Sequence, residues 1–324
     1  MLLACLPAWH AAASNPNYAE RPEVQDFIRA VAERHGFLEQ ELLFLFSQVR
    51  RTEPVLESIK PPPKPRSWEE YRNNFVNPRR IAAGTAFWQT HRRALARAER
   101  SYGIPAEYIV AILGVETFYG RNPGRWRVVD ALTTLAFDYP PRAPYFRDEL
   151  EHYLLLARES GSDVFAVRGS YAGAIGIPQF MPSSTRRYAV DFDGNGAIDL
   201  RRSAPDAIGS VANFLKQHGW HPGGEVLLGA RVSGEAWRAA ADGSVDPKHA
   251  LAELRAAGVE LAQSPREEDA RAALIELETP ERPSGFRVAF RNFWVLTRYN
   301  RSAFYASAVH DLAAELKKAQ ERGR

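Results

Sequence analysis

The chain has 324 residues, of which 45% are hydrophobic, 25% charged and 11% aromatic, a composition typical of soluble globular proteins. Its net charge of only +3 and its dispersed arginine pairs argue against a nucleic-acid partner and give weak support to an anionic surface as partner. The single cysteine excludes an internal disulfide and a cysteine-based metal site, and no stretch beyond the amino terminus approaches the roughly 20 apolar residues of a membrane span.

The amino terminus places that cysteine in a short apolar context. Residues 1–5 read Met-Leu-Leu-Ala-Cys, which is similar to the lipid-attachment motif of bacterial lipoproteins. A secretory signal needs a basic start and an apolar stretch of about 7–15 residues, and fewer residues than that precede Cys5. Residues 1–20 are therefore interpreted as a remnant signal with a lipid anchor at Cys5, as the stump of an ordinary signal ending at 11–14, or as a disordered terminus.

Helical patterns alternate with breaks through the first two thirds of the chain. Apolar residues recur at helical spacing over 22–50, and the prolines at 61–65 then form an extended connector. Further helices are predicted over about 78–101, 105–119, 145–159 and 205–218, with Pro105 at a favoured first-turn position.

The residue pattern changes between 222 and 298. β-rich runs at 225–232, 273–278 and 286–290 predict strands, and 248–257 is predicted as a helix within this segment. The tail over 302–320 is again helical. The expected fold class is therefore α+β and mainly α, with a small β-rich subdomain late in the chain.

Glu116 is a candidate acid–base group. The helix before it is apolar on every face from Tyr108 to Val115, so it is expected to be buried. A carboxyl at the end of a buried helix loses solvation, which raises its pKa and suits it to general acid catalysis near neutral pH. The alternative is a glutamate at the helix rim that pairs with an arginine such as Arg121, and periodicity alone favours this alternative.

A second candidate segment, residues 169–184, reads Gly-Ser-Tyr-Ala-Gly-Ala-Ile-Gly-Ile-Pro-Gln-Phe-Met-Pro-Ser-Ser. Its glycines and alanines permit a tight turn and a close approach of the backbone. Such a turn suits either the lining of a cleft or the packing of two helices, and composition does not choose between the two.

Together, the two segments resemble the lytic murein transglycosylase B family, glycoside hydrolase family 103. The resemblance joins Gly-Val-Glu-Thr at 114–117 to the segment 169–184, in that order along the chain. It extends from about Tyr71 to the carboxy-terminal helix, with further ordered matches at 131–135, 137–140, 206–213 and 297–300.

This resemblance implies a lysozyme-like core with a helical domain and a small β-rich subdomain around it. Beyond the terminal segment 1–20, we expect an amino-terminal helical segment with its connector over 21–65. The expected catalytic core covers 66–221 and includes an EF-hand-like loop at 191–206. The β-rich subdomain is expected over 222–298, and the carboxy-terminal helix over 299–324 returns to the helical domain.

The resemblance also implies roles for individual residues. Glu116 takes the position of the catalytic acid and base, and Ser170 and Gln179 match cleft residues that hold the N-acetyl and peptide-bearing region of the substrate. The remaining matches contact or line the glycan groove, although any one of the aromatic residues taken alone suits a core position better: Tyr71, Arg142, Phe180, Tyr299, Asn300 and Tyr305.

Two positions depart from the family pattern. Pro140-Pro141-Arg142 leaves one arginine where the family often has two, and Phe214 stands where the family can carry a tyrosine. Both changes affect the expected grip on the substrate peptide and not the expected reaction.

The implied reaction cleaves the MurNAc–GlcNAc β-1,4 bond of peptidoglycan without water and leaves 1,6-anhydro-MurNAc ends. One alternative is a lysozyme-like muramidase, in which a second carboxylate comes from among Asp130, Asp138, Asp148, Glu149 and Glu151. The other is a non-catalytic wall-binding module. We expect no catalytic cofactor, a monomer that binds peptidoglycan strands and not nucleic acid, and a periplasmic location with attachment to the outer membrane if Cys5 is lipidated.

Residues 191–199 read Asp-Phe-Asp-Gly-Asn-Gly-Ala-Ile-Asp and match the start of an EF-hand loop. Oxygen ligands then fall at Asp191, Asp193, Asn195 and the backbone carbonyl of Ala197. Arg202 occupies the usual closing position, and the resemblance implies that Asp206 closes a longer loop instead. We predict a structural calcium ion here, and the alternative is an Asp/Asn/Gly turn without an ion.

Overall fold

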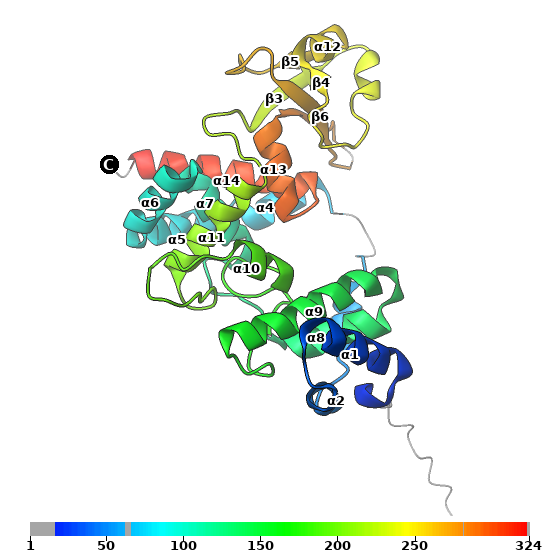
Figure 1. The fold of residues 1–324 in the computed structure, drawn as a ribbon. Coiled ribbons are helices and arrows are strands. Elements are labelled where there is room, and N and C mark those ends of the chain that lie inside the picture. Colours follow the sequence, from blue (N-terminus) through cyan, green and yellow to red (C-terminus); the bar gives the residue numbers. More distant parts are fainter. Residues whose placement is uncertain (1–16, 62–65, 281, 323–324) are drawn as a thin grey trace, which may run out of the picture.

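The structure, a computed structural model, describes residues 17–61, 66–280 and 282–322. The predicted lipid anchor at Cys5, the signal end at 11–14 and residues 62–65 of the proline connector lie outside the described residues. The described chain forms three hydrophobic clusters. Figure 1 shows the arrangement of the elements that carry them, with a lower helical layer, a central part and a β-rich subdomain at the top.

Helices dominate the described part of the chain. The α-helices are α1 (Pro22–His35), α2 (Glu39–Ser47), α3 (Glu53–Ile59), α4 (Trp68–Phe75), α5 (Pro78–Thr90), α6 (Arg92–Tyr102), α7 (Ala106–Thr117), α8 (Val128–Asp138), α9 (Ala143–Ser160), α10 (Pro182–Tyr188), α11 (Ala204–Gln217), α12 (Leu251–Ala256), α13 (Arg291–Tyr299) and α14 (Ala303–Arg322). The 3-10 helices are η1 (Tyr18–Glu20), η2 (Pro140–Arg142) and η3 (Ala236–Ala239). The strands are β1 (Trp126–Arg127), β2 (Arg168–Gly169), β3 (Leu227–Val232), β4 (His249–Ala250), β5 (Val259–Leu261), β6 (Arg271–Leu277) and β7 (Gly285–Ala289).

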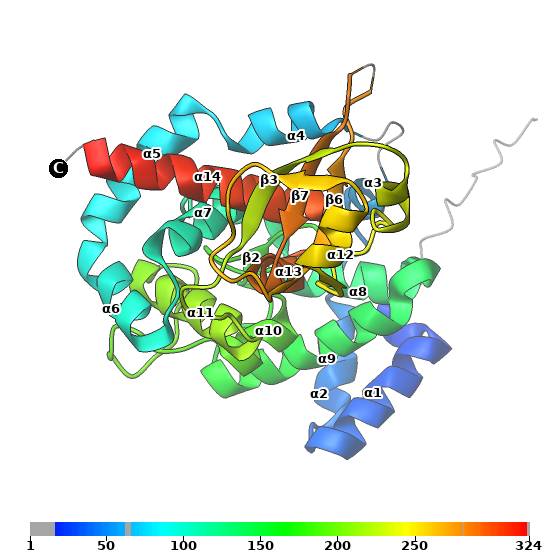
Figure 2. The same cartoon turned by 90° about the horizontal axis from the view of Figure 1, so that it is seen from above.

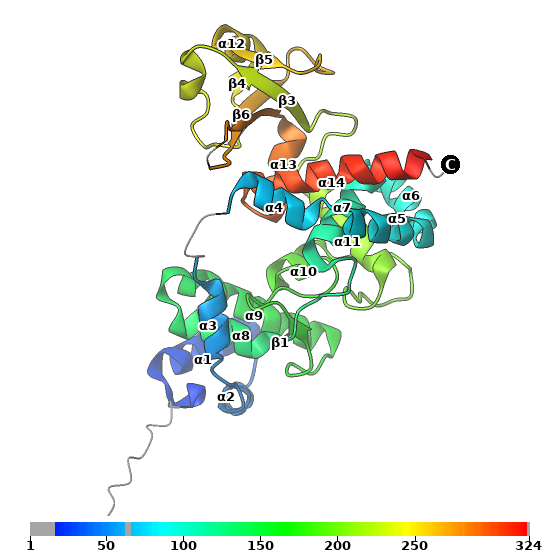
Figure 3. The ribbon, with the colours of Figure 1, turned by 180° about the vertical axis from the view of Figure 1, so that it is seen from behind.

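The lower layer joins the amino-terminal helices to α8 and α9. α1 begins with Pro22 in its first turn and ends at Gly36, whose φ of 66° suits glycine. The buried face of α1 packs into the same hydrophobic cluster as α8 and α9, and these two helices lie side by side (Figure 3). Residues 17–61 therefore share a core with residues 128–160.

α7 runs through the central core in contact with α5, α6, α11 and α14. Every residue from Tyr108 to Val115 is buried, which confirms that protein surrounds this helix. α14 lies along α7 (Figure 2). Asp311 of α14 accepts hydrogen bonds from Arg72 of α4 and Arg287 of β7, so one part-buried carboxylate joins three elements at the boundary with the β-rich subdomain.

An antiparallel sheet with the strand order β4-β6-β7-β3-β5 forms the β-rich subdomain. Successive side chains of a strand point to opposite faces. Accordingly, Leu228, Leu274 and Val288 pack with α12 on one face, whereas Ala273 and Ala289 join the hydrophobic cluster of the central core. Because alternate side chains point to opposite faces, one face of the sheet packs on α12 and the other packs against the central core.

The fold class predicted from the sequence, mainly α with a small β-rich part, is confirmed. α8 was not predicted, since Val128, Val129, Thr133 and Thr134 are β-branched and have low helix propensity, and burial on all sides outweighs that preference. The range 222–298 ends in α13, which packs into the central cluster.

Among the described residues, no helix is both long enough and apolar enough to span a bilayer.

Candidate active site

Glu116 lies in the last turn of α7. The helix ends there because Phe118 and Tyr119 adopt left-handed backbone conformations, with φ of 53° and 61°, which side chains of this size rarely adopt. The Arg80 guanidinium of α5 donates a hydrogen bond to the carbonyl of Gly114, and the Tyr119 hydroxyl donates one of 3.0 Å to the Arg80 carbonyl. α5 therefore fixes the end of α7 and, with it, the direction of Glu116.

The Glu116 carboxyl is part-buried, and its Oε1 accepts a hydrogen bond of 2.6 Å from the hydroxyl of Tyr305 on α14. Desolvation by the surrounding protein raises the pKa of Glu116 to about 7, and the hydrogen bond from Tyr305 opposes that rise. Arg121 lies over the ring of Phe118, and within the described chain Glu116 forms no ion pair with it. A carboxyl that holds its proton near neutral pH can donate it to a leaving group.

The two sequence segments meet at Thr117. Its buried hydroxyl donates a hydrogen bond of 2.8 Å to the carbonyl of Ile177 and accepts one of 2.8 Å from the amide of Gly120. The approach is close, because a Cβ at Gly120, just after α7, would lie 3.2 Å from Cγ1 of Ile177 in the turn. The segment 169–184 therefore forms a turn that packs against the end of α7.

Ser170 and Gln179 stand at the two ends of this turn. The Ser170 Oγ accepts hydrogen bonds of 3.2 and 3.0 Å from backbone amides of its own turn, so its proton is available to a ligand. The Gln179 Nε2 donates to the carbonyls of Pro123 and Gly176 at 3.0 and 2.8 Å. Both donors of this amide are used, which leaves its Oε1 as an acceptor.

A cavity of about 680 Å³ opens beside this turn. It brings together five residues that the sequence assigned to the substrate groove, namely Arg142, Gln179, Phe180, Tyr299 and Asn300. The other residues that line it are Tyr145, Glu149, Met181, Ser183, Ser184, Phe214, Arg298 and Arg301.

Tyrosines from three helices connect the cavity to Glu116. The rings of Tyr299 and Tyr305 stack with centroids 6.4 Å apart, and the Tyr299 hydroxyl donates a hydrogen bond of 2.5 Å to the carbonyl of Pro178. Burial and, secondarily, the charge of Glu116 raise the pKa of Tyr71 to about 12. Tyr305 is only 2% exposed, so its ring faces the protein interior.

Phe180, which also lines the cavity, is likewise 2% exposed. Its ring packs against Phe214 and Tyr299, with centroid distances of 5.6 and 5.7 Å. Phe180 therefore serves mainly as a packing residue in the wall of the cavity and exposes little of its ring to solvent.

Several lining residues were not assigned to substrate binding from the sequence. Tyr145 and Glu149 lie one helical turn apart on α9, and Arg298 and Arg301 flank the matched pair Tyr299-Asn300. Helical spacing was the available signal for the first pair. Proximity to a motif was the signal for the second pair, but neither signal shows that α9 and α13 face the same cavity.

The acids considered as a second carboxylate have partners elsewhere. The oxygens of Glu149 accept hydrogen bonds of 2.9 and 2.6 Å from the amide and hydroxyl of Ser183. Asp130, Asp138, Asp148 and Glu151 pair with Arg127, Arg21, His152 and Arg34 respectively. Of these five acids, Glu149 is the one that lines the cavity, and its buried carboxylate caps the start of α10.

The loop at 191–206 gathers three carboxylates. Asp191, Asp193 and Asp206 each place an oxygen within 4.8 Å of the others. Buried Asp206 accepts hydrogen bonds from the amides of Phe192, Asp193 and Asp199, which orders the loop around it. The Asn195 side chain accepts from the amide of Ala197. Carboxylate and carbonyl oxygens form the donor set that suits calcium, so these residues fit the ion.

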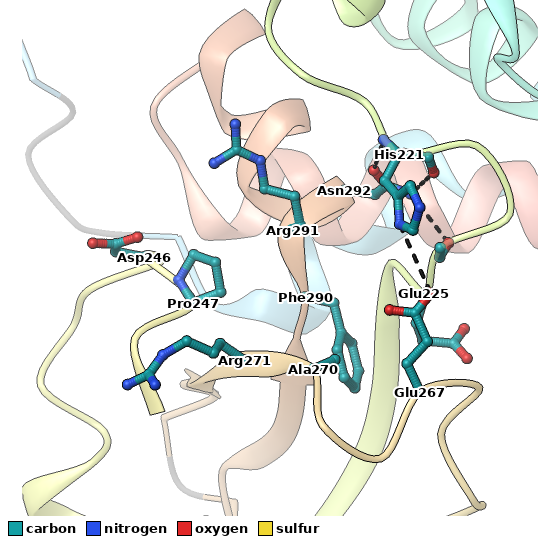
Figure 4. A pocket seen from close by; sticks show the side chains of 11 residues that line it. His221, Glu225, Asp246, Pro247, Glu267, Ala270, Arg271, Phe290, Arg291 and Asn292 are labelled. Atoms are coloured by element: carbon teal, nitrogen blue, oxygen red, sulfur yellow. Dashed lines mark hydrogen bonds and ion pairs between the residues drawn. The ribbon is translucent and has the colours of Figure 1, made fainter. Parts of the chain in front are cut away.

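A second cavity of about 360 Å³ lies between the β-rich subdomain and the start of α13 (Figure 4). His221, Glu225 and Glu267 gather on one side of it, whereas Asp246, Arg271 and Arg291 lie toward the other. None of the residues assigned to catalysis or the groove lines this cavity, whereas five of them line the cavity of about 680 Å³. Glu116, Tyr71, Ser170 and Tyr305 are not among the residues that line that larger cavity, and Glu116 is linked to it through Tyr305 and Tyr299.

The fold and the site define an enzyme with a lysozyme-like core, in which one desolvated carboxyl ends a buried helix beside an aromatic groove. A family model described as "Transglycosylase SLT domain" matches residues 19–314. The membrane-bound lytic murein transglycosylase B of Escherichia coli (strain K12) is 42% identical over 308 residues, which cover 91% of this chain and 83% of that protein. The chain belongs to the transglycosylase SLT domain family and is a peptidoglycan lytic transglycosylase.

Solved structures of related enzymes share the whole fold. The soluble lytic transglycosylase SltB1 from Pseudomonas aeruginosa has a TM-score of 0.86 at 47% identity, covering 93% of this chain and 100% of that one. Escherichia coli Slt35, solved in complex with calcium, has a TM-score of 0.82 at 40% identity, covering 95% and 94%. SltB3 from Pseudomonas aeruginosa, solved with NAG-NAM-pentapeptide, has a TM-score of 0.81 at 30% identity, covering 94% and 80%.

Proposed function

We propose that Glu116 cleaves the MurNAc–GlcNAc β-1,4 bond of peptidoglycan, acting first as an acid and then as a base. Protonated Glu116 donates its proton to the leaving glycosidic oxygen. The resulting carboxylate removes the proton of the C6 hydroxyl of the same MurNAc, whose oxygen attacks C1 and closes a 1,6-anhydro ring. Because this nucleophile is already tethered to the reacting sugar, little translational entropy is lost.

The observation that carries this proposal is the environment of the Glu116 carboxyl. Burial raises its pKa to about 7, so a substantial fraction is protonated at neutral pH and ready to donate. The hydrogen bond from Tyr305 stabilises the carboxylate that forms, which suits the second step. Glycosidases of the ordinary kind use two carboxylates, whereas the neighbouring acids here are engaged with their own partners.

We propose that the turn and the aromatic wall orient the glycan. The free donor of Ser170 and the free acceptor of Gln179 suit the N-acetyl and peptide-bearing part of MurNAc. Tyr299, exposed Asn300 and Arg142 line the groove cavity. In this proposal Tyr71, which feels the charge of Glu116, extends the wall toward the reacting bond, and Arg142 contacts the peptide. Aromatic faces match the apolar C–H surfaces of sugar rings. Buried Phe180 and Tyr305 hold this wall in place.

We also propose that the loop holds a structural calcium ion, through the side chains of Asp191, Asp193, Asn195 and Asp206 and the carbonyl of Ala197. The three clustered carboxylates support this proposal, as does the calcium complex of Slt35. Bound calcium would neutralise the acidic cluster and stabilise the folded loop.

We place the enzyme in the periplasm, where its substrate lies, with attachment to the outer membrane if Cys5 carries a lipid. The relative named as membrane-bound supports this location. The proposed partner is the peptidoglycan strand, bound by a monomer.

Mass analysis of muropeptides released from purified sacculi tests the proposed reaction. We expect almost all new ends to be 1,6-anhydro-MurNAc, because the tethered hydroxyl captures C1 in a groove from which water is largely kept. Murein whose MurNAc C6 hydroxyls are blocked should resist cleavage at those units. A majority of reducing MurNAc ends would identify a hydrolase instead.

A further inference from the structure

α13 presents a basic ridge beside the groove. Arg291, Trp294 and Arg298 are three and four residues apart and so share one face of the helix. The guanidinium carbons of the two arginines lie 4.2 and 4.4 Å from the centre of the Trp294 ring. Arg301 follows directly after the helix and, like Arg298, lines the groove cavity. Stacking on Trp294 limits the freedom of Arg298 and holds it in place.

The charged side chains that line the groove cavity carry a net positive charge. Its charged lining consists of Arg142, Arg298, Arg301 and a single acid, Glu149, whose oxygens already accept hydrogen bonds from Ser183. None of the three arginines forms an ion pair with any acid in the described ranges.

Arg298 is the least satisfied of these cations. Its Nε is buried without a hydrogen-bond partner among the described residues, and its Nη2 donates only to the hydroxyl of Thr297, at 3.1 Å. Desolvation, followed by the positive charge of Arg301, lowers its pKa, whereas the charge of Asp246 acts the other way. An anionic ligand in the cavity would relieve both the repulsion and the unmet hydrogen bonding.

We infer that Arg298 and Arg301 bind carboxylates of the stem peptide attached to MurNAc, and that they make the enzyme selective for glycan with charged stems. This inference rests on the proposed function and adds a specificity to it. The guanidinium fork matches the two oxygens of a carboxylate, and stem peptides supply carboxylates, whereas the sugar hydroxyls carry no charge. The two residues act in recognition and not in bond cleavage.

The test uses glycan oligomers with tetrapeptide stems in two forms, one with free stem carboxylates and one with these groups converted to methylamides. The rate constant kcat/KM for release of anhydro products is measured on both forms. We expect the wild-type enzyme to prefer the free form by at least about tenfold, and Arg298→Gln and Arg301→Gln each to reduce this preference by about tenfold. Arg301→Lys should retain part of it, since the charge remains.

Arg93→Gln is the matched control, because Arg93 is an exposed arginine of α6, away from the groove lining. It should leave the preference unchanged. An equal fall in Arg93→Gln would indicate general electrostatic attraction and would overturn the inference.

An equal rate on both substrates, or a preference that survives Arg301→Gln, would also overturn it. Arg301 is exposed, so this variant tests the inference even if Arg298→Gln fails to fold. Absence of anhydro product from both forms with the wild-type enzyme would instead refute the proposed function.

Discussion

The hydroxyl of Tyr305 donates a hydrogen bond of 2.6 Å to Oε1 of Glu116, although the two residues are 189 positions apart in the chain. Burial among helices raises the pKa of this carboxyl, and the hydrogen bond lowers it. The balance, a pKa of about 7, lets one group give up a proton and then take one back.

Glu116→Gln should lower kcat on murein by at least about a hundredfold, because the amide keeps the shape of the side chain but has no acidic proton. Glycan binding and the circular dichroism spectrum should be retained. Glu107→Gln, at the first turn of the same helix, is the matched control and should keep its activity. Activity of Glu116→Gln within tenfold of the parent would refute the catalytic assignment.

In the proposed mechanism the acid form of Glu116 starts the reaction, so kcat/KM should fall as the pH rises through about 7. Tyr305→Phe removes the hydrogen bond that lowers this pKa, so the falling limb should move to higher pH. Tyr153→Phe removes a hydroxyl that donates to the carbonyl of Val164, away from the site, and should leave the limb in place. A limb that stays unchanged or moves to lower pH in Tyr305→Phe would contradict the role of this bond.

The same pKa predicts a pH-dependent difference in stability between Glu116→Gln and the parent. The folded-state pKa is raised from 4.5 to about 7, so the stability that protonated Glu116 contributes is complete below 4.5 and is lost as the pH rises through 7. Glutamine does not titrate. From pH 4.5 to 8, urea unfolding should show the variant gaining on the order of 2–3 kcal/mol relative to the parent. A difference that is constant with pH would contradict the raised pKa.

Thr117→Val should disconnect the two segments of the active site. The substitution keeps the shape of the side chain but leaves the Ile177 carbonyl and the Gly120 amide without their partner. We expect the free energy of unfolding to fall by about 1–3 kcal/mol, together with kcat. Thr117→Ser keeps the hydroxyl and should restore most of both. Equal behaviour of the valine and serine variants would show that this hydroxyl does not support the site.

Calcium at millimolar concentration should raise the Tm of the parent protein, since only the folded loop can gather its ligands. Asp191→Ala combined with Asp193→Ala should abolish the increase, because two of the three clustered carboxylates are lost. Asp269→Ala removes an exposed acid outside the cluster and should keep the increase. If calcium leaves the Tm of the parent unchanged, the loop is a turn stabilised by its own hydrogen bonds.

The local sequence pattern was sufficient for much of the architecture. The run from Tyr108 to Val115 is apolar on every face, so its burial follows from the sequence pattern. For Glu116 itself, periodicity alone favoured a glutamate at the helix rim, and the resemblance of the two segments to a known family assigned it as the acid. The β-rich runs at 225–232 and 273–278 likewise predicted strands, which the structure has as β3 and β6. These features depend on neighbours in the chain, which a sequence displays directly.

Contacts between distant segments were decided only by the tertiary structure. The sequence predicted the helix over 302–320 but not α13, which lies in the range assigned to the β-rich subdomain. It did not show that Tyr305 meets Glu116, or that Arg298 and Arg301 share a cavity with Arg142. Side-chain spacing along a helix specifies which residues lie together on one face. Which faces meet depends on the packing of the whole core, because each helix can bury its apolar side against more than one neighbour.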